Sequence, residues 1–382
     1  MKQRVMTEVD HHTTNKKNIM KPKTFLILAS SLILFHCNCA VCADVPTVFQ
    51  LPDEVKWITP PDFEPIKNPK MKWADETMTG RPYSKDPTVI RFRGRYLMYF
   101  SLPPNEKEPK PYQWTCGIAE SQDLDHWKLV KQIVPMQECD ARGLAAPCAK
   151  VFNNRVYLFY QSYGNRNMND DGICLAWSDD GINFTPHTKN PIFKPRGDWT
   201  NTRAIDAEAI IFKGKLFLYG STRDPERIYQ KTVVATADPE GLKDPENKLG
   251  PDAWTLAFDG AIMEPELPWE TKCIEAATIC QRGDSLIKFY AGGYNNDPQQ
   301  IGVARSEDGI HWTRLWNVPF IPNGPPGQWN SAESGHPGVF VDGDKTYLFF
   351  QGNPGLVDGK RLWFLSYVEI GWKDDVPYVL EP

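Results

Sequence analysis

The sequence predicts an all-β protein: a five-bladed β-propeller with four-stranded antiparallel blades around a central axis. Three observations support this prediction. A unit of two apolar strands joined by a tight polar turn returns five times, and no amphipathic helix recurs between the strands. The chain of 382 residues is also 41% hydrophobic and 12% aromatic, which is ample for a packed core. Propellers of this length commonly form one domain.

The five units begin with similar segments. They read "KDPTVIRFRGRYLMYFS" from Lys85, "AAPCAKVFNNRVYLFYQS" from Ala145, "IDAEAIIFKGKLFLYGS" from Ile205, "IEAATICQRGDSLIKFYAGG" from Ile274 and "GHPGVFVDGDKTYLFFQG" from Gly335. Each has an apolar strand, a turn of the Arg-Gly or Asn-Asn kind, and an aromatic-rich strand, which is the pattern of a β-hairpin. A period of roughly 60 residues suits a blade with generous loops.

Third strands follow as "TCGIAES", "GICLAWS", "TVVATA", "IGVARS" and "RLWFLSYV". Three of the units then end alike, in "SQDLDHW", "SDDGINF" and "SEDGIHW", with an aromatic residue six positions after the serine. We interpret these endings as structural. The polar residues form a turn, and the aromatic residue fills the space between neighbouring sheets. The segment 238–253 is expected to be a surface loop.

The positions that open the five units are rich in ionisable residues. They are Asp86, Ala146 or Pro147, Asp206, Glu275 and His336. Since the first strand of each propeller blade lines the central axis, these side chains are expected to meet in one axial pocket. Buried carboxylates are costly unless a partner or a function keeps them there. Two carboxyl groups with separated pKa values are what glycoside hydrolysis requires, one as acid and one as base.

The N-terminal region is predicted to be a targeting segment. Residues 1–43 are predicted to be a signal peptide whose true start is Met20, with an apolar run from Phe25 to Phe35 and small residues before a cleavage site. We expect a secreted or periplasmic protein, with lipid attachment at Cys37 as the less favoured alternative. Residues 44–82 are interpreted as an N-terminal arm, and residues 83–382 as the propeller and catalytic domain.

Charge and cysteine content limit the kinds of partner and metal site that the sequence suggests. A formal net charge of −5 without a basic block argues against nucleic acid, and the apolar run is too short for a membrane span. Six cysteines remain after the signal segment, either as disulfides or as buried thiols. No CxxC pair indicates zinc.

The leading segments together resemble glycoside hydrolase family 43 and its relatives with five-bladed catalytic propellers, including families 32 and 117. The resemblance covers roughly residues 80–382. It implies that Asp86 of "KDP" is the general base, that Asp206 tunes pKa values and orients the acid, and that Glu275 is the general acid. It also implies that His336 lies at the centre of the site, with a structural Ca²⁺ possible there and His336 as its candidate ligand. The sequence departs from the family pattern at Ala145, where Trp is usual, and after Asp206 and Glu275, where Pro and Gly are usual.

Several alternatives remain open among the residues. Glu208 rivals Asp206, and Glu333 is an alternative carboxylate that is expected to lie in a loop before the strand. The apolar neighbours of Glu275 are expected to raise its pKa. Aromatic side chains can stack on sugar rings, and Arg203 could hold substrate hydroxyls or a carboxylate. The candidate substrate-binding residues are therefore His336, Arg203 and the tryptophans Trp73, Trp114, Trp199 and Trp329.

The predicted function is that of an exported glycoside hydrolase acting on oligo- or polysaccharides of plants or algae. We expect an inverting, exo-acting enzyme similar to α-L-arabinofuranosidases and β-xylosidases, without a required cofactor. Alternatives are an anhydrogalactosidase, a fructosidase, a sialidase-like or phosphorylase-like propeller, and a carbohydrate-binding propeller without catalysis. A sialidase would need three arginines and a nucleophilic tyrosine.

Overall fold

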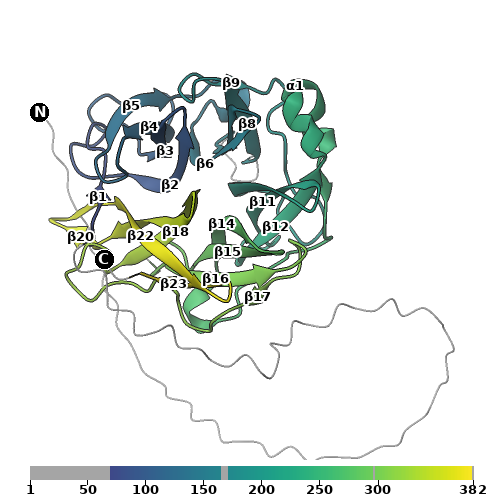
Figure 1. Ribbon diagram of the computed structural model, residues 1–382. Coiled ribbons are helices and arrows are strands. Elements are labelled where there is room, and N and C mark those ends of the chain that lie inside the picture. Colours follow the sequence, from purple (N-terminus) through teal and green to yellow (C-terminus); the bar gives the residue numbers. More distant parts are fainter. Residues whose placement is uncertain (1–68, 165–170, 296, 381–382) are drawn as a thin grey trace, which may run out of the picture. The chain divides into compact units, whose positions relative to one another are not determined.

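A computed structural model describes residues 69–164, 171–295 and 297–380. The predicted signal peptide and most of the predicted arm lie outside these residues. The described chain is a five-bladed β-propeller, as predicted, with the blades arranged around a central axis (Figure 1). Each sheet is antiparallel, and blades follow one another in chain order. No helix in the described part of the chain is long and apolar enough to cross a membrane.

The first four blades each contain four consecutive strands. Blade one holds β2 (Lys85–Phe92), β3 (Arg95–Leu102), β4 (Thr115–Ser121) and β5 (Lys128–Ile133). Blade two holds β6 (Leu144–Phe152), β7 (Arg155–Ser162), β8 (Ile173–Ser178) and β9 (Thr185–Pro186). Blade three holds β10 (Ile205–Phe212), β11 (Lys215–Arg223), β12 (Gln230–Ala237) and β13 (Thr255–Leu256). Blade four holds β14 (Ile274–Arg282), β15 (Ser285–Gly292), β16 (Gln300–Ser306) and β17 (Thr313–Arg314).

Blade five closes the ring with a strand from the other end of the chain. It contains β18 (Glu333–Asp342), β19 (Lys345–Asn353), β22 (Phe364–Lys373) and β23 (Val376–Val379). The short strand β1 (Lys72–Trp73), within the segment predicted to be an arm, pairs antiparallel with β22. A small hairpin, β20 (Leu356–Val357) and β21 (Lys360–Arg361), precedes β22. The pairing of β1 with β22 ties the beginning of the propeller to its last blade.

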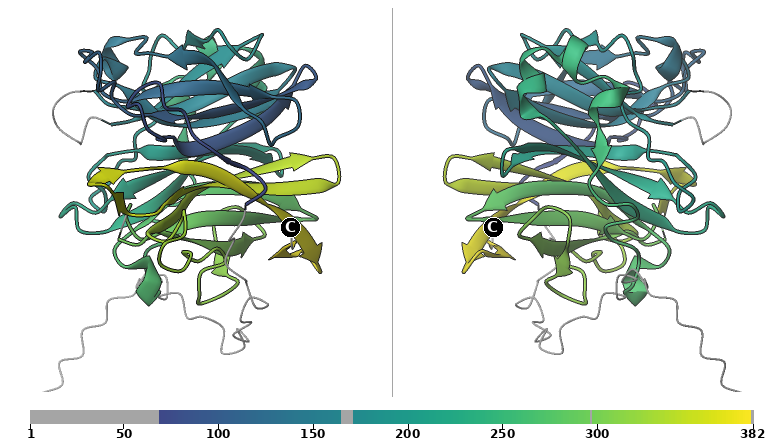
Figure 2. Two further views of the ribbon diagram at one scale, coloured as in Figure 1. Left: turned by 90° about the vertical axis from the view of Figure 1, so that its left-hand side faces the viewer. Right: turned by 90° about the vertical axis from the view of Figure 1, so that its right-hand side faces the viewer.

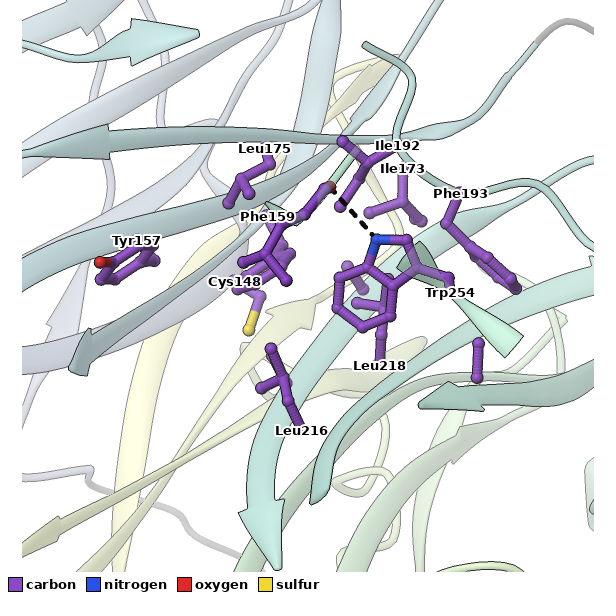
Figure 3. Packing of buried hydrophobic residues seen from close by; sticks show 14 of the residues in the cluster. Cys148, Tyr157, Phe159, Ile173, Leu175, Ile192, Phe193, Leu216, Leu218 and Trp254 are labelled. Carbon is purple, nitrogen blue, oxygen red and sulfur yellow. Dashed lines mark hydrogen bonds between the residues drawn. The ribbon is translucent and has the colours of Figure 1, made fainter. Parts of the chain in front are cut away.

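The core consists of five hydrophobic clusters, one between each pair of neighbouring blades. Alternation along the second strand of a blade supplies two clusters at once, because successive side chains point to opposite faces. In β11, Leu216 and Leu218 face blade two, whereas Phe217 and Tyr219 face blade four. Figure 3 shows the cluster between blades two and three, and the side views in Figure 2 show neighbouring sheets packed face to face.

The serine-to-aromatic endings have the predicted structural role. In "SEDGIHW" the Ser306 hydroxyl and the Asp308 carboxylate bond within the turn, and Trp312 is 2% exposed. Trp312 packs edge-on against Tyr219 of the preceding blade, and the Tyr219 hydroxyl donates to the carbonyl of Gly309. The same contact recurs between Phe184 and Tyr99, and between Trp127 and Phe349.

The segment 238–253 differs from the predicted surface loop. It forms three short helical turns, η3 (Pro239–Lys243), α1 (Pro245–Lys248) and η4 (Pro251–Ala253), and the other 3₁₀ turns are η1 (Glu138–Asp140) and η5 (Pro268–Glu270). Leu242 and Leu249 are buried in the cluster between blades two and three. Most residues of the segment are exposed or partly exposed, as expected, but it is not an irregular loop, because these two leucines anchor an otherwise polar segment.

The described cysteines are all free thiols: Cys116, Cys139, Cys148, Cys174, Cys273 and Cys280. Five are buried and Cys139 is partly exposed. The buried-thiol alternative therefore describes this structure.

Candidate active site

A β-bulge interrupts the first strand of every blade at the same place. The pairing of β2 with β3 skips between Lys85 and Thr88, and the equivalent strands skip in the same way. One residue of each bulge has a left-handed backbone conformation, with φ between 44° and 55°: Asp86, Ala146, Asp206, Ala276 and His336. Non-glycine residues adopt this conformation at a cost of about 1–3 kcal/mol, and such strain concentrates at functional sites. Five repeats of it turn the strand ends toward the axis.

The bulges correct the predicted alignment of the fourth blade. Asp86, Asp206 and His336 occupy the left-handed position, but in blade four that position holds Ala276. Glu275 stands one residue earlier, where blade one has Lys85. Glu275 was expected at the same register as Asp86. The sequence alignment missed the offset because an acidic residue occurs at either of two adjacent positions.

The predicted ionisable residues nevertheless meet in one pocket. A cavity of about 140 Å³ is lined by residues from all of the blades. Asp86, Arg203, Asp206, Glu275 and His336 belong to it, as predicted. Its lining also includes Lys85, Trp114, Gln161, Tyr163, Arg223, Gln230, Tyr294 and Asn295.

His336 lies between two of the carboxylates. Its Nδ1 is 2.9 Å from Asp86 Oδ1, and its Nε2 is 3.4 Å from Glu275 Oε1. Burial alone would lower the pKa of His336, but Asp86 and Glu275 raise it well above the usual value. Burial likewise opposes ionisation of Asp86, yet His336 and Lys85 hold its pKa far below the usual range. The resting site therefore holds an imidazolium and an ionised Asp86.

Asp206 is the carboxyl group that retains a proton near neutral pH. Burial and the neighbouring charge of Glu275 raise the pKa of Asp206 to about 7. Its Oδ2 is buried and has no hydrogen-bond partner among the described residues. Two carboxyl groups that share one site cannot easily both ionise, so one of them keeps its proton. An unpartnered carboxyl oxygen in a cavity is available to a substrate or a water molecule.

Glu275 does not have the raised pKa that its apolar sequence neighbours suggested. Burial favours the neutral acid, but His336 and the Gln299 amide lower the pKa of Glu275. Gln299 Nε2 donates to Glu275 Oε1 at 2.7 Å, and Gln230 Nε2 donates to Glu275 Oε2. The expectation failed because long-range partners, which local sequence does not contain, stabilise the charged form.

The two rival carboxylates have structural partners instead. Glu208 is buried and pairs with Lys150 at 2.5 Å. Glu333 is the first residue of β18 and not a loop residue, and it is fully buried. Its Oε1 accepts hydrogen bonds from Gln351 and from the indole of Trp363. Neither lines the 140 Å³ cavity.

Three of the tryptophans predicted to stack on sugar rings lie outside the axial cavity. Trp73 packs edge-on against Phe100, Trp199 donates its indole N–H to Asp259, and Trp329 packs against Phe350. None of them lines the cavity, whereas Trp114, the fourth candidate, does. Tryptophan in a loop is not specific for a site because it also fills gaps between blades.

Sequence reasoning missed two cations in the pocket, Lys85 and Arg223. Lys85 directly precedes Asp86, so the "KDP" segment could have indicated that Lys85 lies near the pocket. Arg223 is the last residue of β11 and contacts the pocket only because its strand ends beside the loop with Tyr294. No sequence motif indicates which strand ends place a side chain in the pocket.

The site does not fit the metal ion that the resemblance implied. Among the described residues, no group of three or more His, Cys, Asp or Glu side chains is arranged to hold a metal. Both ring nitrogens of His336 already lie beside carboxylates, at 2.9 Å from Asp86 and 3.4 Å from Glu275, so neither nitrogen is turned toward a separate ligand set.

Comparisons with known proteins agree with this fold and identify the family. The family described as "Glycosyl hydrolases family 43" matches residues 77–377. A beta-1,2-mannobiose phosphorylase of Thermoanaerobacter sp. (strain X514) is 25% identical over 213 residues, which are 52% of this chain and 59% of that protein. The chain thus matches little more than half the length of this relative.

Two solved structures share the fold. A thermostable family-43 glycoside hydrolase superposes with a TM-score of 0.60 at 19% identity, covering 81% of this chain and 96% of that one. An exo-1,5-alpha-L-arabinanase from a bovine ruminal metagenomic library has a TM-score of 0.57 at 15% identity, covering 81% and 99%. At these identities the likeness concerns the fold alone.

Proposed function

Because this chain belongs to family 43 of the glycosyl hydrolases, we propose that it hydrolyses glycosidic bonds of an oligo- or polysaccharide, with its chemistry in the axial pocket. The observation that carries the proposal is the arrangement of Asp86, Asp206, Glu275 and His336 around one cavity. An ionised carboxylate and a protonated carboxyl group in the same pocket are the two groups that the reaction needs.

Asp86 acts as the general base in this proposal. Its low pKa keeps it ionised, so it can take a proton from the attacking water. Asp206 and Glu275 together carry the proton for the leaving oxygen. In the substrate-free protein that proton resides on Asp206, and the pair delivers it through Glu275, the residue assigned as acid. His336 is a positioning residue that lies between Asp86 and Glu275 and keeps Asp86 ionised.

The geometry favours inversion of the anomeric carbon. Asp86 and Glu275 approach opposite nitrogens of the His336 ring, so the width of an imidazole separates them. Inverting glycosidases use the wider of two carboxyl spacings, because a water molecule must fit beside the sugar. We propose exo-action because a small axial pocket accepts a chain end more readily than a chain interior. The arabinanase among the solved structures makes α-L-arabinofuranosides the first substrates to test.

The test is hydrolysis of a panel of aryl glycosides by the wild type, Asp86→Asn and Glu275→Gln. The panel contains α-L-arabinofuranoside, β-D-xyloside, β-D-galactoside, α-L-galactoside and β-D-fructofuranoside. Turnover of one glycoside should fall by about 10²–10⁴-fold in both variants, in line with the loss of an acid or base, while sugar binding persists. Asp179→Asn, which alters a surface carboxylate paired with Arg155, is the matched control. Full activity in Asp86→Asn or Glu275→Gln would contradict the assignment. NMR of the first product anomer distinguishes inversion from retention.

Phosphorolysis is a second candidate, favoured by the named phosphorylase relative and by the cations in the pocket. In that case phosphate replaces water as the attacking group. Turnover would depend on added inorganic phosphate and yield a sugar 1-phosphate. The sialidase alternative has less support, because the described cavity lining contains two arginines and not three.

Export remains part of the proposal. It rests on residues 20–43, which lie outside the described residues. N-terminal sequencing of the mature protein from its native host should begin near Asp44. A mature protein that retains residues 20–43 in the cytoplasm would contradict export.

A further inference from the structure

Two cations of the axial pocket have no carboxylate partner. Among the described residues, no Asp or Glu oxygen lies within ion-pair distance of Lys85 or Arg223, whereas Arg203 pairs with Asp171 at 2.9 Å. Lys85 is 8% exposed. Burial of a lysine ammonium is costly, and Lys85 has no carboxylate in direct contact to offset that cost.

Neutral groups hold both cations in place. Lys85 Nζ donates to the Asn295 amide oxygen at 3.1 Å and lies over the rings of Trp114 and Trp363. Arg223 Nε donates to Gln230 Oε1 at 3.0 Å, and its guanidinium lies over the Tyr294 ring. The two anchors, Tyr294 and Asn295, are consecutive residues, so one stretch of chain positions both cations. Aromatic faces and amides stabilise a cation without neutralising it.

These cations stand beside the reacting groups. Lys85 directly precedes Asp86, and Gln230 bonds both Arg223 and Glu275. All of these residues line the same 140 Å³ cavity. Burial would lower the pKa of Lys85, but Asp86 and Glu333 raise it, so the ammonium stays charged. Asp86 and Glu333 balance part of the Lys85 charge from a distance, so a ligand in the pocket meets two cations that no carboxylate of the described residues contacts directly.

We propose that Lys85 and Arg223 bind an oxyanion substituent, a carboxylate or a sulfate ester, on the sugar that enters the pocket. The substrate class is then an acidic saccharide, one with uronate or sulfated residues. A guanidinium fork and an ammonium are the side chains that bind such groups best. This inference rests on the proposed function, because it names the substrate of the same pocket.

Free inorganic phosphate is also an oxyanion that Lys85 and Arg223 could bind. A dianion beside the ionised Asp86 and Glu275 would experience more repulsion than a single charge held at the edge of a sugar ring. An oxyanion carried by the sugar is therefore favoured over free phosphate, and the experiment below distinguishes the two.

The test compares two aryl glycosides that differ by one carboxylate, β-D-xyloside and β-D-glucuronide, together with β-D-galactoside and β-D-galacturonide. The selectivity ratio is kcat/KM for the acidic sugar divided by kcat/KM for its neutral counterpart. It should exceed one in the wild type and fall about tenfold or more in Arg223→Gln, with part of the loss restored in Arg223→Lys. Lys345→Gln, which removes a surface cation paired with Glu369, is the control for net charge.

A binding measurement separates this inference from the proposed reaction. Calorimetric titration of free glucuronate, galacturonate and xylose into the wild type, Glu275→Gln and Arg223→Gln does not require turnover. Uronate binding that is lost only in Arg223→Gln supports the site even when no glycoside is hydrolysed. Equal binding of uronate and xylose by the wild type, or an unchanged ratio in Arg223→Gln, overturns the proposal. Turnover that requires inorganic phosphate would contradict the claim that the bound oxyanion belongs to the sugar.

Discussion

His336 Nδ1 lies 2.9 Å from Asp86 Oδ1, although 250 residues of sequence separate them. Both residues occupy the left-handed position of a β-bulge, one in the first blade and one in the fifth. Since β1 pairs with β22 to close the ring, the first and last blades are neighbours. The contact between a buried imidazolium and a buried carboxylate therefore depends on closure of the propeller.

Replacing His336 with Gln should shift the pH dependence of catalysis. Without the imidazolium the pKa of Asp86 rises, so the base is ionised only at higher pH. The acid limb of the profile of kcat/KM against pH is expected to move up by at least about one unit, equivalent to roughly 1.4 kcal/mol. The measurement is kcat/KM at acidic to alkaline pH, starting below the usual pKa of an aspartate, so that the limb falls inside the profile of the variant and at or below its acid end in the wild type. His311→Gln, at a surface pair in which His311 Nδ1 lies 2.6 Å from Asp308 Oδ2, should leave the limb in place.

An unchanged acid limb in His336→Gln, with activity merely reduced, would show that the histidine does not set the ionisation of Asp86. The same pair also contributes to stability over a defined pH window. The contribution of Asp86 is lost as pH falls through its lowered pKa, and that of His336 is lost as pH rises through its raised pKa.

Asp206→Asn should stabilise the protein at alkaline pH and not at acidic pH. The pKa of Asp206 is raised to about 7, so the folded protein loses stability as pH rises from the unfolded value toward 7. An amide of the same shape avoids this ionisation, with a gain on the order of 2–4 kcal/mol at pH 8. Urea unfolding at pH 5 and pH 8 measures the difference. An equal effect at both pH values would contradict the raised pKa. Activity should fall, because the shared proton is lost.

Lys288 provides a test outside the active site. It is fully buried, with its Nζ 4.0 Å from the centre of the Trp312 ring and 3.7 Å from Met263 Sδ. Burial, with Arg314 adding to it, lowers the pKa of Lys288 well below its usual value. The unfolded chain therefore binds more protons, and wild-type stability rises with pH.

Lys288→Met should consequently raise the free energy of unfolding by about 1–3 kcal/mol at pH 6 and by less at pH 9. Denaturant unfolding at both pH values gives the comparison. Lys213→Met, at an exposed lysine over the Phe212 ring, should change stability by no more than a few tenths of a kcal/mol. A loss of stability in Lys288→Met at both pH values would mean that the cation–π contacts outweigh desolvation.

Ala276→Gly should stabilise the fold, against the usual effect of glycine in a strand. Ala276 has a φ of 50°, which glycine adopts without strain, so the free energy of unfolding should rise by about 0.5–1 kcal/mol. Ala277→Gly is the matched control, since Ala277 is equally buried and is not among the residues with positive φ. The Ala277→Gly variant should lower the free energy of unfolding by a similar amount. Equal losses in both variants would show that the bulge is not strained at Ala276.

The repeat made most of the fold predictable. Each hairpin turn, such as Arg93-Gly94 and Lys213-Gly214, has the positive φ values that its residues suggested, and each blade begins where its first apolar strand was expected. These features depend on neighbours in sequence: turn chemistry and alternation act over a few residues. The failures came where distant residues decide, as with Leu242 and Leu249, which are buried against blade two.

The sequence by itself determined the five-bladed architecture and the set of ionisable residues at the blade openings, because both follow from a local pattern that returns five times. Only the tertiary structure decided their chemistry. It placed Glu275 one residue off the register of Asp86, lowered the pKa of Glu275 through His336 and Gln299, and left the proton on Asp206. It also brought Lys85 and Arg223 to the same cavity. Protonation and charge in a buried site depend on the sum of burial and partners from every blade, and those partners meet only when the ring closes.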